Sequence, residues 1–175
     1  MKPQILKFII RPARFPEEVE AVHVAFCDYQ TDIGVDLGLQ GFDEELAGLP
    51  GKHETVLLAE SGHGIGGCAG SRPLSGDAAE MKRLFVYPWA RGTGLGRAFT
   101  LAVINEACRL GYRKLHLDTF QSKMPSAVAL YRALGFREVQ GPKRGRRTPD
   151  LVDMELELLA AAAADGYAQE AGSAE

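Results

Sequence analysis

The sequence predicts an α/β (α+β) fold in which a mixed sheet carries helices on its faces. Strand-like and helix-like segments follow one another in the order βααββ(β)αβαββ, which is typical of such a fold. The chain has 175 residues, enough for one domain with its own hydrophobic core. Residues 151–158 alternate between apolar and acidic side chains, as a half-buried strand does.

The N-terminal half is expected to contain three strands and two helices. They are a strand at 5–10, helices at 17–29 and 42–49, and the two strands of a hairpin at 55–60 and 65–71. Pro16 suits the first position of the longer helix, and Val19, Val22 and Phe26 follow at helical spacing. The Ser-Gly-His-Gly segment at 61–64 is typical of a hairpin turn.

The next strand, at 80–86, changes its pattern halfway. Its apolar residues move from odd to even positions: Ala79 and Met81, then Leu84 and Val86. One face of a strand cannot stay buried through this change unless an extra residue is inserted, so we predict a β-bulge around 82–84. The alternative is a strand buried on both faces, with Phe85 in the core as well.

The C-terminal half continues the alternation of helices and strands. Its expected elements are a helix at 97–110, a strand at 115–120, a helix at 125–134, a short strand at 136–140 and the strand at 151–158. Gly111 is expected to end its helix as a left-handed residue, and Gly135 to close the second helix. In the last strand the acidic side chains, Asp153 among them, are expected to point outward. Residues 160–175 are expected to form a flexible tail, which leaves 1–159 as a single domain.

Composition argues against several classes of protein. Lys and Arg number 20 and Asp and Glu 23, giving a net charge of −3, so no general affinity for nucleic acid is expected. Cys27, Cys68 and Cys108 show no paired or metal-ligand spacing, which favours a reducing compartment and no metal site. No apolar run approaches the roughly 18 residues that span a bilayer, and no early segment resembles a signal peptide. We therefore expect a cytoplasmic protein that binds no membrane.

The most informative segment is Arg-Gly-Thr-Gly-Leu-Gly at 91–96, which lies between an expected strand and an expected helix. Its glycines leave room for several backbone N–H groups to converge on one ligand. These groups are also the free donors of the first helical turn, at the positive end of the helix dipole. The segment therefore predicts an anion site, and the usual anion is phosphate.

Two phosphate-binding motifs fit this sequence poorly. A nucleotide triphosphatase loop needs Lys and then Ser or Thr after its last glycine, but Arg97-Ala98 stands there. Residues 62–67 match the Gly-x-Gly-x-x-Gly motif of a dinucleotide-binding turn. The residues that follow, 68–70, continue a strand and do not begin a helix.

The segment 91–96, preceded by Arg-Leu-Phe-Val-Tyr-Pro at 83–88, resembles the acetyl-CoA site of the GNAT superfamily of N-acetyltransferases. Leu-Tyr-Arg-Ala-Leu-Gly-Phe at 130–136 resembles the second conserved block of that family, at the usual distance downstream. The resemblance covers roughly residues 5–158. It implies a mostly antiparallel central sheet of six to seven strands, with a bulged, splayed fourth strand and about four helices on the faces.

The resemblance also implies where acetyl-CoA would bind. It assigns coenzyme binding to Leu84, Phe85, Val86, Arg91, Gly92, Thr93, Gly94, Leu95, Gly96 and Arg97. The amides of 92–96 would hold the diphosphate, and the two arginines would add positive charge unless they are ordinary solvated residues. The pantetheine arm would pair with the bulged strand, where the sheet opens toward 115–120. An N–H freed by the bulge would face the thioester oxygen as it gains negative charge.

Two residues are candidates for proton transfer. Tyr131 is the candidate acid, because a phenol with a pKa of about 10 stays protonated at neutral pH and can donate to a departing thiolate. Its alternative is a core tyrosine, since it fits the apolar stripe of its helix. Glu80 is the candidate base, at a position where many family members carry a strand carboxylate. A free Glu titrates at about 4.3, so it would act through water or with a raised pKa, unless it is a surface residue.

Three other features also carry expectations. His116 is more readily explained as a hydrogen-bonded structural residue than as a participant in deprotonation. The basic loop at 143–147 is hypothesised to attract an anionic acceptor, the alternative being a solvated charged loop. Met124 stands where many family members have Asn, so the polar contact that Asn would make to the coenzyme is not expected here.

The leading function is direct transfer of the acetyl group of acetyl-CoA to a primary amine of a small molecule or protein. The alternative is a non-catalytic acyl-CoA sensor or regulatory module. Only the enzyme needs Glu80 and Tyr131, so their presence favours catalysis. The sequence does not identify the acceptor, and a homodimer is one expectation for the oligomeric state because dimers are common in the family.

Overall fold

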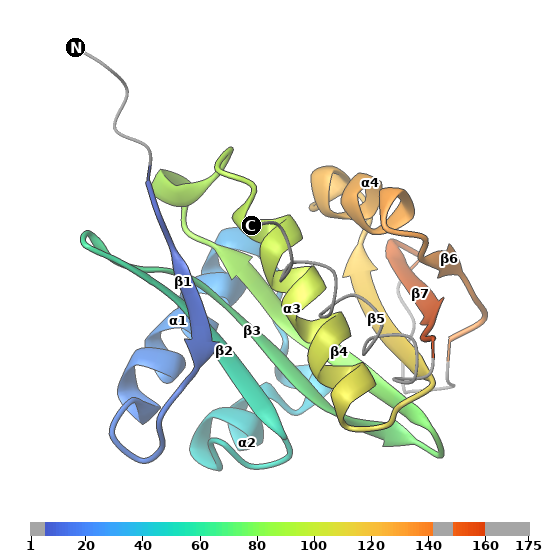
Figure 1. Cartoon of the computed structure of the whole chain (residues 1–175), viewed down its shortest axis with the longest axis horizontal. Helices are drawn as coiled ribbons and strands as arrows, with labels where there is room; N and C mark the ends of the chain where they lie inside the picture. Colours follow the sequence, from blue (N-terminus) through green and yellow to red (C-terminus); the bar gives the residue numbers. More distant parts are fainter. Residues whose placement is uncertain (1–5, 142–148, 160–175) are drawn as a thin grey trace, which may run out of the picture.

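The computed structural model describes residues 6–141 and 149–159, which form a seven-stranded sheet in the order β1-β2-β3-β4-β5-β7-β6 (Figure 1). The strands are β1 (Ile9–Pro12), β2 (Thr55–Ser61), β3 (Gly64–Ser75), β4 (Ala78–Val86), β5 (Lys114–Phe120), β6 (Arg137–Glu138) and β7 (Leu151–Glu157). Only β4 and β5 pair in parallel, and the other neighbours are antiparallel. The prediction of a mixed, mostly antiparallel sheet is confirmed.

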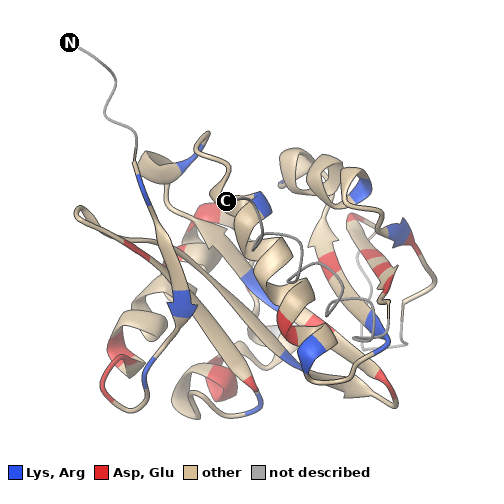
Figure 2. Ribbon diagram, in the orientation of Figure 1, with Lys and Arg blue, Asp and Glu red and all other residues tan. Residues whose placement is uncertain are grey.

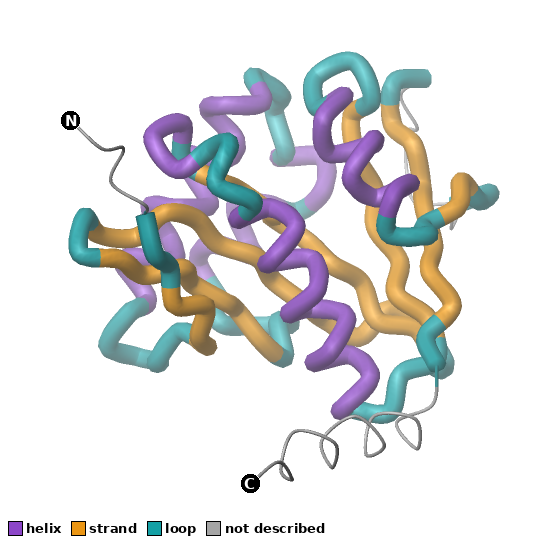
Figure 3. The backbone as a smooth tube through the Cα atoms, turned by 45° about the horizontal axis from the view of Figure 1, so that its top comes forward, coloured by secondary structure: helices purple, strands orange, loops and turns teal. Residues whose placement is uncertain are grey.

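Helices cover both faces of the sheet. They are α1 (Val19–Ile33), α2 (Phe42–Ala47), α3 (Leu95–Arg109) and α4 (Pro125–Ala133), with short 3₁₀ turns η1 (Gly38–Gln40) and η2 (Pro88–Ala90). Helices α3 and α4 lie on one face, and α1 and α2 lie on the other (Figures 1 and 3). Successive residues of β2 point to opposite faces of the sheet and pack in different hydrophobic clusters. Leu57 belongs to the core under α3, and Leu58 to the core under α1. Within the described residues, no helix is both long and apolar enough to cross a bilayer.

The β-bulge predicted in β4 is present. Lys82 pairs with Gly70 and Phe85 with Cys68, so β4 has one residue more than β3 between these two pairs. Arg83 takes up the extra length in a left-handed conformation, with φ 58°. The strands approach closely beside the bulge: a Cβ on Gly67 would lie 2.3 Å from the Phe85 carbonyl oxygen. Phe85 is also buried, so the alternative view of this strand was right about that side chain.

The splay expected between β4 and β5 is also present. These strands pair at three positions only, Ala78 with Lys114, Ala79 with Leu115 and Glu80 with His116. Toward the carboxyl end of β4 the two strands diverge (Figure 1). The divergence leaves the β5 side of 82–86 open to a ligand, with α3 and α4 on either side of the opening.

Two details of the sequence-based prediction were wrong. Helix α1 begins at Val19 because Pro16 lies in a turn, closed by hydrogen bonds from the Glu18 amide to Arg14 (2.7 Å) and from the Val19 amide to Pro16 (3.1 Å). Asp153 is buried, not outward, because it pairs with a buried histidine of β5 and lies beneath residue 141. Gly111 and Gly135 do take positive φ values, 86° and 96°.

Acidic and basic residues are interspersed along the ribbon (Figure 2), in keeping with the small net charge of −3. Two expectations lie outside the described residues: the basic loop at 143–147 and the tail at 160–175.

Candidate active site

A groove of about 540 Å³ runs from the opening beside β4 to the start of α3. The ten residues assigned to coenzyme binding all line it, apart from Thr93. The hydroxyl of Thr93 instead donates to the Ala90 carbonyl at 2.7 Å and closes the turn that precedes α3. The other wall comes from α4 and the residues before it, including Met124, Ala127 and Leu130. The groove thus joins the two sequence blocks that carried the family resemblance.

The glycine turn presents backbone amides to this groove. Gly92 and Gly94 have φ values of 77° and 83°, a conformation that side chains with a Cβ rarely adopt. The first helical hydrogen bond runs from the Ala98 amide to the Gly94 carbonyl at 3.0 Å. The amides that come before Ala98 in the first turn therefore lack helical acceptors and lie at the positive end of the α3 dipole. This geometry suits an anion.

Charged side chains of both signs line the groove. Arg91 donates from Nη2 to the Asp32 carboxylate at 2.7 Å and from Nε to the Val86 carbonyl at 3.0 Å. Arg97 and Lys123 line the same space. Asp32 belongs to the last turn of α1, so this helix contributes one carboxylate to a groove that otherwise suits a negatively charged ligand.

A much smaller polar cavity adjoins the groove. Its volume is about 20 Å³, and Tyr29, Leu84 and Met124 line both spaces. The cavity has room for about one water molecule. Its polar lining comes from α1, η1, β4, β5 and α4, and includes Gln40 and Tyr131. We call this space the polar cavity, and the larger space the groove.

Tyr131 lies in the polar cavity on the inner side of α4. Its ring is buried and packs against Phe136, with 5.6 Å between the ring centroids. Burial, followed by the charges of Tyr29 and Asp118, raises the pKa of the Tyr131 hydroxyl well above its usual range. The hydroxyl therefore keeps its proton at neutral pH, and the interpretation of Tyr131 as a core residue is confirmed by its burial.

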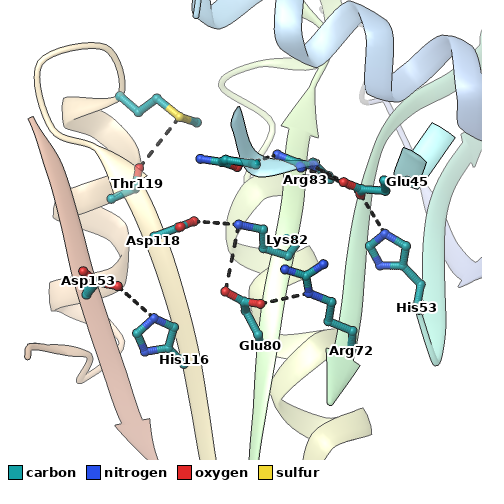
Figure 4. Close-up of polar contacts among 12 residues, drawn as sticks. Glu45, His53, Arg72, Glu80, Lys82, Arg83, His116, Asp118, Thr119 and Asp153 are labelled. Atoms are coloured by element: carbon teal, nitrogen blue, oxygen red, sulfur yellow. Dashed lines mark hydrogen bonds and ion pairs between the residues drawn. The ribbon is translucent and has the colours of Figure 1, made fainter. Parts of the chain in front are cut away.

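Glu80 lies beneath the polar cavity and does not line it. Its side chain is 1% exposed and accepts a hydrogen bond from Arg72 Nε at 2.9 Å (Figure 4). Its other carboxylate oxygen lies 3.9 Å from Lys82 Nζ. The interpretation of Glu80 as a surface residue is therefore wrong, and the carboxylate is one shell removed from the cavity.

Lys82 and Asp118 line the cavity itself, and sequence reasoning did not assign them a role. Lys82 Nζ donates to Asp118 Oδ1 at 3.0 Å across the splay between β4 and β5 (Figure 4). Burial raises the pKa of Asp118, but the charges of Lys82, Arg83 and His116 outweigh it, so the net shift is downward and the group stays a carboxylate. No local signal singles out this pair, because both strands hold other charged or polar residues, among them Glu80, Arg83 and His116.

The bulge is held by a second buried cluster of charges. The Arg83 guanidinium donates to both Glu45 carboxylate oxygens, with Nη2 at 2.6 Å from Oε2, and His53 Nε2 lies 2.8 Å from Glu45 Oε1 (Figure 4). Arg83 also donates to Gln40 at 3.3 Å. Burial raises the pKa of Glu45, but the hydrogen bonds from His53 and Arg83 outweigh it and lower the pKa to about 2. Helix α2 is thereby fixed to the bulged residue of β4.

His116 has a structural partner, as expected. Its Nε2 lies 3.0 Å from Asp153 Oδ1, and both side chains are buried between β5 and β7 (Figure 4). This pair holds β7 beside β5 and lies outside the linings of the groove and the polar cavity.

Comparison with known proteins agrees with the fold and the groove. The Acetyltransferase (GNAT) domain family matches residues 52–138, which include the glycine turn and all of α4. An uncharacterized N-acetyltransferase of Schizosaccharomyces pombe is 34% identical over 164 residues, covering 90% of this chain and 98% of that protein. The uncharacterized N-acetyltransferase YjgM of Escherichia coli is 31% identical over 90 residues, or 50% of this chain and 53% of that protein.

Solved structures share the fold. A GNAT-family acetyltransferase of Staphylococcus aureus superimposes with a TM-score of 0.73 at 19% identity, over 87% of this chain and all (100%) of that one. The putative acetyltransferase yncA of Salmonella typhimurium, solved with acetyl-CoA, has a TM-score of 0.64 at 24% identity, over 87% and 94% of the two chains. The chain belongs to the GNAT superfamily of N-acetyltransferases. It is an N-acetyltransferase, and the alternative of a non-catalytic module is not supported.

Proposed function

We propose that this enzyme transfers the acetyl group of acetyl-CoA directly to a primary amine of a small molecule or protein. The single observation that supports this best is that the two spaces adjoin: the groove that ends at the glycine turn and the cavity that holds Tyr131 share Tyr29, Leu84 and Met124 in their linings. A coenzyme whose diphosphate lies at the turn would extend its thioester toward the cavity.

The residues along the groove fit coenzyme A. The amides of 92–96 suit the diphosphate, and Arg91 and Arg97 add positive charge around it. Farther along, Leu84, Phe85 and Val86 present the open side of β4, whose backbone groups suit the amides of the pantetheine arm. An amide that the bulge frees from pairing with β3 would face the place where negative charge develops on the thioester oxygen.

Tyr131 is proposed to act on the sulfur. When bound, acetyl-CoA supplies a thioester whose C–S bond breaks as the new C–N bond forms, leaving the electron pair on sulfur. The raised pKa of Tyr131 makes full proton transfer to a thiolate, whose conjugate acid titrates at about 8.5, unfavourable. Tyr131 would therefore donate a hydrogen bond that stabilises the departing thiolate, and solvent would complete its protonation.

Glu80 is proposed as the base, acting through water. Its buried carboxylate lies behind Lys82, so a proton leaving the acceptor amine would reach it along a hydrogen-bonded path and not by direct contact. A cysteine nucleophile is not needed for this route. Burial raises the pKa of the Cys68 thiol to about 12, which keeps it protonated and unreactive.

The proposal also covers the location, domain extent and oligomeric state of the enzyme. Cys27, Cys68 and Cys108 are free thiols, which supports a cytoplasmic site of action. A single domain over 1–159 and a homodimer are proposed on the family resemblance, and light scattering of the full chain would test the oligomeric state.

The function is tested by mixing the full chain with acetyl-CoA and a panel of primary amines while free thiol is measured. We expect amine-dependent release of one thiol per acetylated product. Coenzyme binding without release for any amine would refute catalysis as proposed, and release that is independent of amine would show hydrolysis.

A further inference from the structure

One pair of charges in the polar cavity has no role in the steps proposed above. The Lys82 side chain is 5% exposed and that of Asp118 18%, and they are joined by the 3.0 Å contact between Nζ and Oδ1. Each comes from one of the two strands that part beyond Glu80 (Figure 4). The pair therefore spans the floor of the opening through which an acceptor would meet the thioester.

We propose that Lys82 and Asp118 form the acceptor site, and that the acceptor is a free α-amino acid. The acceptor ammonium group would bind Asp118, and its neighbouring carboxylate would bind Lys82. This inference rests on the proposed function, because it names the substrate class for the same site.

The spacing of the pair suits this acceptor. In an α-amino acid the nitrogen and the nearer carboxylate oxygen are joined through three bonds, N–Cα, Cα–C and C–O. This places the two atoms roughly 3 Å apart. The Lys82 and Asp118 atoms that they would contact are 3.0 Å apart. The acceptor can therefore lie alongside the ion pair of the protein. Its ammonium group would then contact Asp118 while its carboxylate contacts Lys82.

Burial explains why the acceptor would need its own carboxylate. An ammonium group that engages Asp118 weakens the pairing of Lys82, and a buried cation that loses its partner is costly. Glu80 is poorly placed to replace Asp118, because it lies 3.9 Å from Lys82 Nζ and is already held by Arg72. A carboxylate on the acceptor restores the partner of Lys82, whereas an amide or a hydrogen in its place does not.

The other charged side chain of the cavity is already compensated. Arg83 is paired with Glu45, outside the cavity lining, and this pair also fixes the bulge. The cavity itself is small, about 20 Å³ with room for about one water molecule, so the acceptor head would contact the pair from the opening between β4 and β5. Gln40 and Thr119 add neutral polar groups to the lining.

The substrate class is tested first with the wild-type enzyme. The twenty common amino acids are screened with acetyl-CoA by thiol release, and the best one is compared with its carboxamide and with its decarboxylated amine. We expect kcat/KM for the free acid to exceed that for either analogue by at least about tenfold, since a charge-assisted contact is lost in both. An amide or amine that reacts as well as the acid would overturn the proposal.

Two variants then separate the roles of the pair. Asp118→Asn should raise the KM for the amino acid at least about tenfold while the KM for acetyl-CoA stays within about twofold. Lys82→Gln should remove the preference for the acid over its amide. The control is Glu157→Gln, which removes an exposed carboxylate from the neighbouring strand β7. Circular dichroism and thermal melts show whether each variant is folded, and coenzyme titration shows whether its groove is intact.

The outcomes distinguish this inference from the function on which it rests. Thiol release with other amines but with no amino acid refutes the acceptor assignment and leaves the acetyltransferase proposal in place. An acceptor KM unchanged in a folded Asp118→Asn enzyme refutes the assignment of the site. Absence of both thiol release and coenzyme binding refutes the proposed function, and this inference with it.

Discussion

The groove and the polar cavity share three residues but are built in different ways. The groove is formed largely by one continuous stretch, from β4 through the glycine turn into α3, and its anion site is made of backbone amides. The polar cavity is formed by side chains from α1, η1, β4, β5 and α4. A site made of backbone depends on local conformation, whereas a site made of side chains depends on packing between distant segments. Substitutions should therefore act on the two spaces in separable ways.

The largest effect is expected at Gly94. Its φ of 83° strains any residue with a Cβ, and Gly94→Val would also turn the first amides of α3 away from the groove. We expect coenzyme affinity to fall by about 100-fold or more, measured by calorimetry. Gly76→Val is the matched control, because Gly76 also has a positive φ, 55°, but lies in the distant β3–β4 turn. Equal loss of affinity in both variants would contradict the role of the turn.

The next effect concerns Tyr131. In Tyr131→Phe, kcat should fall by roughly 10²-fold, within the range for loss of one proton-donating group, while the KM for acetyl-CoA changes little. Tyr112→Phe serves as control, since that hydroxyl bonds Glu54 at the surface, 2.8 Å away. Steady-state kinetics on both variants measures kcat and KM. A Tyr131→Phe enzyme with full kcat would show that the Tyr131 hydroxyl takes no part in the reaction.

A third prediction concerns the buried cluster behind the cavity. Glu45→Gln leaves the buried guanidinium of Arg83 without its counter-charge, so we expect a loss of about 3–5 kcal/mol in the free energy of unfolding. Glu138→Gln, which removes the exposed partner of Arg132, should cost less than about 1 kcal/mol. Urea unfolding of the three proteins measures both values, and equal losses would mean that the cluster adds no more stability than the exposed pair does.

The same cluster predicts a dependence of stability on pH. The pKa of Glu45 is lowered to about 2 in the folded protein, from 4.5 when unperturbed. Its contribution is therefore complete above the unperturbed pKa and is lost as the pH falls toward the folded pKa. The difference in unfolding free energy between wild type and Glu45→Gln should shrink over that range. A difference that stays constant down to the folded pKa would be inconsistent with the ion pair.

The smallest effect is expected at Asp32, where the two spaces are linked through α1. Asp32→Asn should release Arg91 and remove a negative charge from the groove, so coenzyme affinity should rise by up to about fivefold. Asp43→Asn, in the first turn of α2, is the matched control. Calorimetry at low and moderate salt would show the gain shrinking as charges are screened. Weaker binding in Asp32→Asn would instead mean that the Asp32 pair positions Arg91 for the coenzyme.

The sequence predicted the features built from backbone better than the contacts between distant side chains. The glycine turn and the bulge depend on short-range pattern, such as the change of parity in β4, and they were predicted with their residues, whereas the splay was expected only from the family resemblance. The Lys82–Asp118 pair joins positions that are 36 residues apart, and its register depends on how β4 and β5 meet. Asp153 shows the same limit: alternation placed it outward, but a histidine on the neighbouring strand draws it inside. A single sequence does not encode such contacts in any local spacing.

The central claim is that backbone amides at 92–96 hold the diphosphate of the coenzyme. Calorimetric titration with coenzyme A, compared with pantetheine, which lacks the diphosphate, tests it most directly. We predict a clear heat of binding for coenzyme A and an affinity for pantetheine at least about 100-fold lower. Equal affinities for the two ligands, or no heat with millimolar coenzyme A, would contradict the account.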